Sequence, residues 1–285
     1  MKKEAFLLMS GLVLKQPWLV SKLEDLYEIL YSECSEDASR DLICELLDRF
    51  LYVDTAMHHA HMVELALEIV SEPGIDDAST QVVAMCADWN ADSSLEILYN
   101  LKPLMEGHGW RQYSLVNRYS HALKTYNSKK QKNIILVDDF VGSGQTVLGR
   151  IKTIKAQFEG SGIADYNIMV KVLASTQSGF DRVVGEGVKI TTQKIIKKGI
   201  DDFYDSLTAA EHRKRMLAIE ELLSPEYMAG EKLRKLPSMG YNEAQATYCR
   251  ENSNTPNSVF PVFWWPFKVD GSERKIVLTR AMGDA

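Results

Sequence analysis

The sequence predicts an α/β protein with a mainly parallel sheet covered by helices on both faces, together with an N-terminal helical region. Three short apolar runs, at residues 82–87, 134–137 and 168–173, each end in polar residues. Strands that are apolar on both faces are typical of a parallel sheet buried between helices. Stretches with helical spacing at 94–101, 146–158 and 180–184 separate these runs, and residues 188–192 form a less certain fourth strand. Strands alternating with helices favour the α/β class.

The first quarter of the chain shows helical periodicity without strand-like runs. Apolar residues recur three or four positions apart between 19 and 69, and the pattern stops at Pro73-Gly74. We therefore expect an N-terminal helical region over residues 1–76 and an α/β domain over residues 77–285, which ends in a helical and aromatic hood. In that last part, Thr208 and Glu211 have the spacing of a capping box that opens a helix. The segment 107–132 has little periodicity and is interpreted as a loop over a site or a solvated connection.

The composition excludes several classes of protein. The chain has 285 residues, 45% of them hydrophobic and 25% charged, and its net charge of -6 argues against non-specific nucleic-acid binding. Its apolar runs are shorter than the ~18 residues that a membrane span requires. The beginning of the chain lacks a signal-peptide cleavage site, and the four cysteines lack the spacing of a zinc site. We expect a cytoplasmic protein that makes no membrane contact and whose cysteines are reduced.

One segment, residues 134–146, carries the functional argument. An apolar strand delivers two adjacent carboxylates, Asp138 and Asp139, and a loop of small residues leads into a helix. Backbone N–H groups of such a loop converge on an anion, and the helix start adds partial positive charge. Carboxylates accept hydrogen bonds from vicinal hydroxyls. Phosphate and diol together describe a ribose 5-phosphate, with the phosphate held by Gly142, Ser143, Gly144, Gln145 and Thr146.

The segment resembles the signature of type I phosphoribosyltransferases, in which a strand runs into two acidic residues, two apolar residues and a Thr/Ser/Gly loop. The resemblance implies that Asp138 and Asp139 meet the ribose 2- and 3-hydroxyls and act as the catalytic pair. It also implies a substrate that is phosphoribosyl pyrophosphate or a nucleotide, and Mg²⁺ bound with the diphosphate. The segment matches neither a P-loop nor a dinucleotide-binding motif.

Further pieces extend the resemblance over most of the chain. They include Phe50-Leu-Tyr-Val-Asp54, Gly240-Tyr-Asn-Glu-Ala-Gln245, Asn254-Thr-Pro-Asn-Ser258 and the aromatic run from Phe260 to Trp265. These pieces are similar to a divergent phosphoribosyltransferase-like branch found in bacterial conflict systems, some of whose members are associated with retrons. The resemblance implies a toxic effector in anti-phage defence, with a retron reverse transcriptase complex as the candidate protein partner.

The loop after the first strand departs from the ordinary enzymes of that family. Asp88, Ser93 and Ser94 are candidate substrate-binding residues there, but residues 88–94 contain no Lys or Arg. An acidic loop opposes a diphosphate unless Mg²⁺ lies between them. This departure keeps a second hypothesis open, namely a regulatory subunit that senses a nucleotide without turnover and signals through a partner.

Two more features remain ambiguous in the sequence. Trp264 is a candidate for stacking on a nucleobase, although burial in the core is the commoner fate of such a ring. His58 and His61 share a helix face, but no third ligand is apparent, so we predict no metal site formed by protein ligands alone. The acceptor base, the target and the oligomeric state are left open.

Overall fold

The computed structural model describes residues 2–87 and 92–281, and its contacts divide the chain into two compact units. The sheet unit comprises residues 55–195, and the helical unit combines the chain up to residue 54 with the chain from 196 onward. These ranges differ from the boundary expected at residue 76, because α4 (Thr55–Val70) packs on strands of the sheet. The division into domains at residue 76 stays a prediction.

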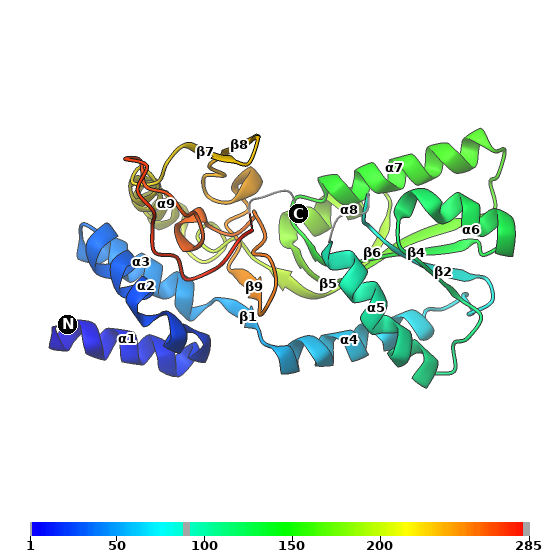
Figure 1. Ribbon diagram of the computed structural model, residues 1–285, viewed down its shortest axis with the longest axis horizontal. Helices are drawn as coiled ribbons and strands as arrows, with labels where there is room; N and C mark the ends of the chain where they lie inside the picture. Colours follow the sequence, from blue (N-terminus) through cyan, green and yellow to red (C-terminus); the bar gives the residue numbers. More distant parts are fainter. Residues whose placement is uncertain (1, 88–91, 282–285) are drawn as a thin grey trace. The chain divides into compact units, whose positions relative to one another are not determined.

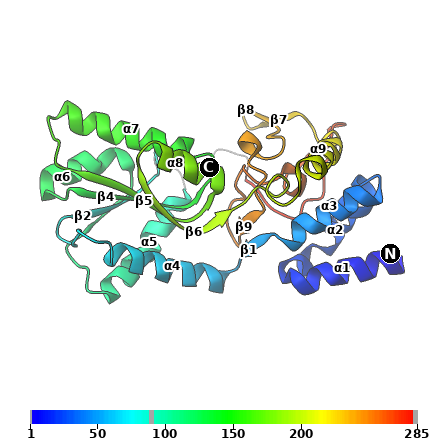
Figure 2. The same cartoon turned by 180° about the vertical axis from the view of Figure 1, so that it is seen from behind.

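The sheet unit contains a five-stranded sheet in the order β3-β2-β4-β5-β6. Its strands are β2 (Thr80–Ala84), β3 (Ser114–Val116), β4 (Asn133–Val141), β5 (Asn167–Thr176) and β6 (Lys189–Ile196). The pairs β2–β3, β2–β4 and β4–β5 are all parallel, which confirms the predicted sheet (Figures 1 and 2).

Helices cover both faces of this sheet, and the two faces of β4 show how (Figure 1). Ile135 and Val137 belong to one apolar cluster, with α4 and α5 (Ser93–Gly107). Ile134 and Leu136 belong to another, with α6 (Ala122–Lys129) and α7 (Gln145–Gly160). Successive side chains of a strand point to opposite faces, so a strand between two helical layers must be apolar throughout.

The prediction for residues 107–132 was wrong, since this segment contains β3, the short 3-10 helix η3 (Tyr119–His121) and α6. These elements have three, three and eight residues, which is too few for a periodic pattern to stand out. Conversely, β4 is longer than its apolar run. It continues to Val141, so Asp138 and Asp139 lie inside the strand and not after it.

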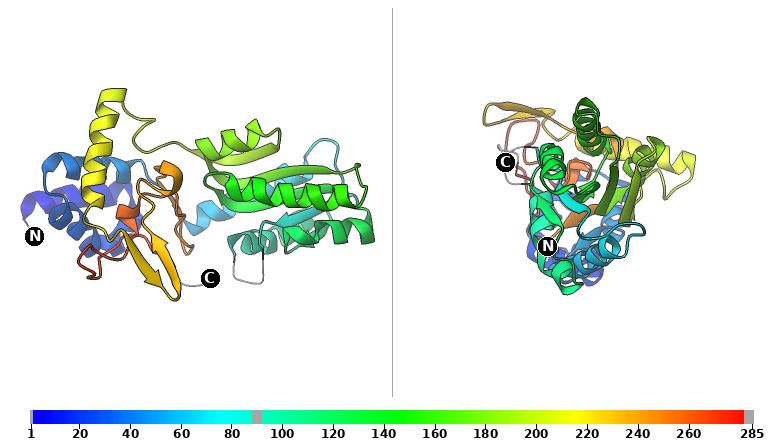
Figure 3. Two further views of the ribbon diagram at one scale, coloured as in Figure 1. Left: turned by 90° about the horizontal axis from the view of Figure 1, so that it is seen from above. Right: turned by 90° about the vertical axis from the view of Figure 1, so that its right-hand side faces the viewer.

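The helical unit holds the N-terminal helices together with the last third of the chain. Its strand β1 (Leu51–Val53) pairs in parallel with β9 (Tyr248–Arg250). The hairpin of β7 (Glu226–Ala229) and β8 (Lys232–Lys235) appears as yellow-orange arrows in Figure 3. The remaining elements are α1 (Lys3–Lys15), η1 (Pro17–Lys22), α2 (Leu23–Glu28), η2 (Ile29–Glu33), α3 (Asp37–Asp48), α9 (Ser206–Glu220), η4 (Tyr241–Glu243) and η5 (Pro261–Phe263).

The start of α9 differs from the predicted capping box. Asp205 caps this helix, because its carboxylate accepts hydrogen bonds from the backbone N–H groups of Leu207 and Thr208. The Thr208 hydroxyl donates to Asp205 at 2.6 Å and so supports the cap without forming it. In the described part of the chain, no helix combines the length and apolar character needed to cross a membrane.

A buried ion pair ties the two chain segments of the helical unit together. Arg274 donates to both oxygens of Glu33, at 2.7 and 2.5 Å, and both side chains are almost fully buried. The guanidinium also donates to the carbonyls of Val262 and Trp265. A buried charge that is fully hydrogen-bonded is tolerated, whereas one that loses its counterion is strongly destabilising.

We predict that Glu33→Gln destabilises the protein by on the order of 3–5 kcal/mol, because Arg274 stays buried without a counter-charge. Thermal and urea unfolding measure the loss. Glu36→Gln is the matched control, since Glu36 is exposed and its ion pair with Arg215 is long, at 3.8 Å. Equal stabilities of the two variants would contradict the assigned role of this pair.

Candidate functional site

The parallel strands bring three polar positions to one edge of the sheet. Ser93 begins the helix that follows β2, Asp138 lies near the end of β4, and Thr176 ends β5. Since β2, β4 and β5 are parallel, their carboxyl ends meet at the same edge. Ligands of open α/β sheets bind at this edge, which makes it the candidate site.

The Asp138 carboxylate accepts two hydrogen bonds at the same oxygen. The Ser93 hydroxyl donates to Oδ1 at 3.0 Å, and the backbone N–H of Asp139 donates to it at 2.9 Å. A side-chain hydrogen bond also joins the carboxyl groups of Asp138 and Asp139. The predicted residues Ser93 and Asp138 are thus brought together in the structure.

The electrostatic surroundings of Asp138 are unfavourable for a charged carboxylate. Burial, followed by the negative charges of Asp139 and Asp92, raises the pKa of the Asp138 carboxyl well above its ordinary value. Asp139 is 8% exposed. A site that gathers three acidic side chains in a partly buried place is costly without a compensating partner, and both a diol and a cation relieve that cost.

The structure does not support a ligand-binding role for Ser94, another predicted residue of the first loop. Asp92 caps α5, because its carboxylate accepts from the backbone N–H of Ser94 at 2.9 Å and from the Ser94 hydroxyl. Ser94 is fully buried by this cap, so the structure gives it a structural role and no exposure to a ligand. Asp88 lies outside the described residues.

The predicted phosphate loop lies between β4 and α7. Gly142, Ser143 and Gly144 connect the two elements, while Gln145 and Thr146 already form the exposed first turn of the helix. Gly144 has a φ of +71°, a left-handed conformation that glycine adopts without strain. The first N–H groups of a helix have no intrahelical acceptor, and they attract anions.

A contact that the sequence did not reveal fixes the shape of this loop. The Thr176 hydroxyl donates to the Gly142 carbonyl at 2.6 Å and accepts from the N–H of Gly179 at 2.9 Å, which caps α8 (Gln177–Gly185). A Cβ on Gly179 would lie 1.9 Å from the Gly142 oxygen. The loop and the start of α8 are therefore in close backbone contact, which only glycine permits.

Arg150 is a second residue that sequence analysis missed. It lies on α7 four positions after Thr146, and its Nε donates to the carbonyl of Met85, just past the end of β2, at 3.2 Å. Its guanidinium lies 4.6 Å above the Tyr119 ring. In the described residues it forms no ion pair, and it brings positive charge to the end of β2. A lone Arg within a helix pattern gives no sequence signal of this placement.

Two further basic residues, Arg118 and Lys124, lie close to His121. Partial burial, together with the positive charges of Arg118 and Lys124, lowers the pKa of His121. Arg182 on α8 donates to the Ser143 carbonyl at 3.4 Å. Arg150 on α7 and Arg182 on α8 are thus the cations whose hydrogen bonds place them beside the end of β2 and the phosphate loop.

The donor set fits Mg²⁺ only in part. Asp138 and its acidic neighbours offer hard oxygen ligands, and their mutual repulsion favours a cation. Within residues 2–87 and 92–281, no group of three or more potential ligands could hold a metal by itself. Mg²⁺ commonly uses one or two carboxylates and completes its shell with substrate phosphates and water. These residues therefore suit a metal that arrives with a diphosphate.

Trp264 belongs to the helical unit. It is 1% exposed, and its indole N–H donates to the Val259 carbonyl at 3.0 Å. A ring buried to this extent offers no face to a base, so its burial favours the core interpretation over stacking.

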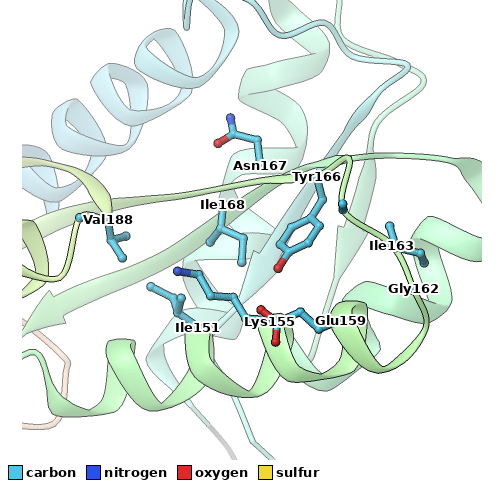
Figure 4. Close-up of a pocket in the computed structure, with 11 residues that line it drawn as sticks. Ile151, Lys155, Glu159, Gly162, Ile163, Tyr166, Asn167, Ile168 and Val188 are labelled. Atoms are coloured by element: carbon cyan, nitrogen blue, oxygen red, sulfur yellow. The ribbon is translucent and has the colours of Figure 1, made fainter.

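A separate hollow of about 680 Å³ lies at the other edge of the sheet (Figure 4). Its lining includes Lys155 and Glu159 from α7, Tyr166, and Asn167 at the start of β5. Because it surrounds the amino end of β5, it is remote in the fold from the carboxyl edge. The candidate site is therefore not this hollow.

We predict that Gly179→Ala disrupts the phosphate loop, since its Cβ would clash with the Gly142 oxygen. A loss of thermal stability and of ligand affinity should follow. Gly185→Ala, at the end of the same helix, is the control, because a Cβ there meets nothing within 4 Å. If both variants behaved like the wild type in melts and in titrations with ribose 5-phosphate, the close contact would not matter.

We further predict that Asp138→Asn raises the melting temperature at neutral pH. The folded-state pKa of Asp138 is raised, so folding favours the protonated form, and the wild type loses stability as the pH rises towards that pKa. The advantage of the variant should therefore shrink as the pH falls to about 4, near the ordinary pKa of Asp. Melts across this range, with exposed Asp165→Asn as control, test the sign; an advantage that grows on acidification would contradict it.

Searches of solved structures return phosphoribosyltransferases. The chain is 12% identical to the Helicobacter pylori xanthine-guanine-hypoxanthine phosphoribosyltransferase, over 52% of this chain and 85% of that one, with a TM-score of 0.31. The Leishmania tarentolae HGPRT-ase in complex with GMP is 15% identical over 53% and 82%, with a TM-score of 0.35. The Aeropyrum pernix orotate phosphoribosyltransferase is 13% identical over 48% and 70%, with a TM-score of 0.32.

No curated protein matches the sequence. The family model PRTase-CE, in contrast, matches residues 33–273. That range contains the acidic pair, the phosphate loop and most of both compact units. The chain therefore belongs to the PRTase-CE family, a phosphoribosyltransferase-like family.

Proposed function

We propose that the carboxyl edge of the sheet binds the ribose 5-phosphate part of phosphoribosyl pyrophosphate or of a nucleotide. The observation that carries this proposal is the acidic pair, with Asp138 held by Ser93 and the backbone of Asp139, directly before a loop held in shape by Thr176. Asp138 and Asp139 accept the ribose hydroxyls. The turn from Gly142 to Thr146 donates backbone N–H groups, and the hydroxyls of Ser143 and Thr146, to the 5-phosphate.

The proposed chemistry is displacement at the anomeric carbon, either transfer of the phosphoribosyl group or cleavage of a glycosidic bond. Positive charge develops on the sugar ring as the leaving group departs, and in this proposal the carboxylate of Asp139 stabilises that charge. Bound Mg²⁺ supplies charge neutralisation for a departing diphosphate. Arg150 adds positive charge near the end of β2, where the acidic first loop has no basic residue of its own.

We propose further that the protein is an effector of bacterial anti-phage defence that works in the cytoplasm and depletes nucleotides or modifies a target. This part of the proposal rests on the sequence resemblance to the branch found in conflict systems, with a retron reverse transcriptase complex as the partner. The acidic first loop favours the alternative, a nucleotide-sensing subunit that acts through a partner without turnover. The effector and the sensor would use the same binding site, but only the effector would convert its ligand.

We predict that Asp138→Asn combined with Asp139→Asn removes binding of phosphoribosyl pyrophosphate or nucleotide while the fold persists. Each charged hydrogen bond to the diol contributes on the order of 1.5–3 kcal/mol, so each loss lowers affinity about tenfold or more. Isothermal titration measures this effect, with a thermal melt of the same sample. Unchanged affinity would remove these residues from the site, and a collapsed melting transition would make the pair structural.

Turnover separates the effector from the sensor. Purified protein is incubated with a cellular nucleotide extract and Mg²⁺, and the pools are followed by mass spectrometry. Loss of phosphoribosyl pyrophosphate or of a nucleotide, absent with the double variant, supports the enzyme. Binding without any change in the pools supports the sensor.

A further inference from the structure

A groove on the helical unit is lined by apolar side chains, two glutamates and one lysine. It has a volume of about 510 Å³ and is lined by residues of α1 and α2. These two helices pack against each other (Figure 1). Its walls are Phe6, Met9 and Ser10 from α1 and Leu23, Glu24, Tyr27 and Glu28 from α2, with Lys275 at one side. We call this surface the α1–α2 groove.

The apolar surface continues along α1 beyond the groove. Ala5, Met9 and Leu12 bury one side of this helix against the unit, yet Phe6 is 55%, Leu7 58% and Leu14 84% exposed. A helix that covers a protein surface normally places polar residues on its outer side. Large apolar residues that gather on the outer side mark a surface that another molecule covers.

The two glutamates of the groove indicate the charge of that molecule. Glu24 and Glu28 are four residues apart on α2 and therefore share one face of the helix. In the part of the chain that the structure describes, neither forms an ion pair, while the neighbouring Asp25 is paired with Lys22 at 4.0 Å. Like charges at this spacing destabilise a helix unless a cation neutralises them. A second copy of this chain, with its net charge of -6, is a poor source of that cation.

We propose that the α1–α2 groove binds one amphipathic helix of a partner protein, whose apolar stripe is flanked by Lys or Arg. The apolar stripe packs on Phe6, Met9 and Leu23, and the basic residues pair with Glu24 and Glu28. This is the helix-in-groove mode, in which apolar anchors supply affinity and the charged residues set orientation. The proposal is independent of the ribose-phosphate site, which lies in the other unit.

The test uses a fluorescent model helix of roughly 16 residues, with Leu at i, i+3, i+4 and i+7 and Lys elsewhere, and a matched helix with Glu in place of Lys. Fluorescence anisotropy with the full chain should show binding of the basic helix, weakening with salt, and much weaker binding of the acidic one. Phe6→Ser with Leu23→Ser, and separately Glu24→Lys with Glu28→Lys, should each lower affinity for the basic helix about tenfold or more.

The controls are matched in chemistry. Leu207→Ser removes an apolar side chain that is 79% exposed, and Glu159→Lys with Glu186→Lys changes two exposed acidic residues of the sheet unit. Both controls should bind the basic helix like the wild type, and circular dichroism melts should show all variants folded. Equal binding by groove and control variants overturns the proposal. Sedimentation that shows a dimer dissolved by Phe6→Ser with Leu23→Ser also overturns it, because the occupant is then a second copy.

Discussion

The arrangement of the candidate site depends on one constraint, the parallel pairing of β4 between β2 and β5. It places the start of α5, the end of β4 and the cap of α8 at one edge of the sheet. Ser93 then reaches Asp138, and Thr176 reaches the carbonyl of Gly142. Without this register Ser93 would not reach the acidic pair, and Thr176 would not reach the loop.

At this edge of the sheet, the residues that the proposed function requires lower the stability of the folded protein. The gathering of Asp92, Asp138 and Asp139 raises the pKa of Asp138 and makes its charged form costly. In the helical unit, by contrast, the buried carboxylate of Glu33 has its full complement of donors from Arg274. A protein that pairs one buried carboxylate with a cation and surrounds another with acidic neighbours is consistent with a ligand-binding role for the second.

The sequence predicted those parts of the fold that have strong local signals. The two-sided apolar runs of β2, β4 and β5 and the helical spacing of α5 and α7 are such signals, and the sheet follows from them. The short elements β3 and α6 were missed, because a few residues carry no period. The place of α4 beside the sheet, and of the C-terminal third beside the N-terminal helices, depends on long-range packing that a linear pattern does not encode.

The candidate site shows the same division. The acidic pair and the loop from Gly142 to Thr146 form a contiguous motif and were found. Gly179 on α8 and Arg150 on α7 lie outside this motif and were missed. Ser94 and Trp264 were predicted as ligand-binding residues, but both side chains are buried in the folded protein. Local sequence thus identifies the ligand chemistry, whereas tertiary contacts decide which side chains reach the ligand.

The most direct test of the central claim is a crystal structure of the chain with phosphoribosyl pyrophosphate and Mg²⁺. The account predicts the 5-phosphate within hydrogen-bonding distance of the backbone N–H groups between Ser143 and Thr146, with the ribose hydroxyls on Asp138 and Asp139. A phosphate bound in the hollow beside Lys155, or a ribose turned away from the acidic pair, would contradict it.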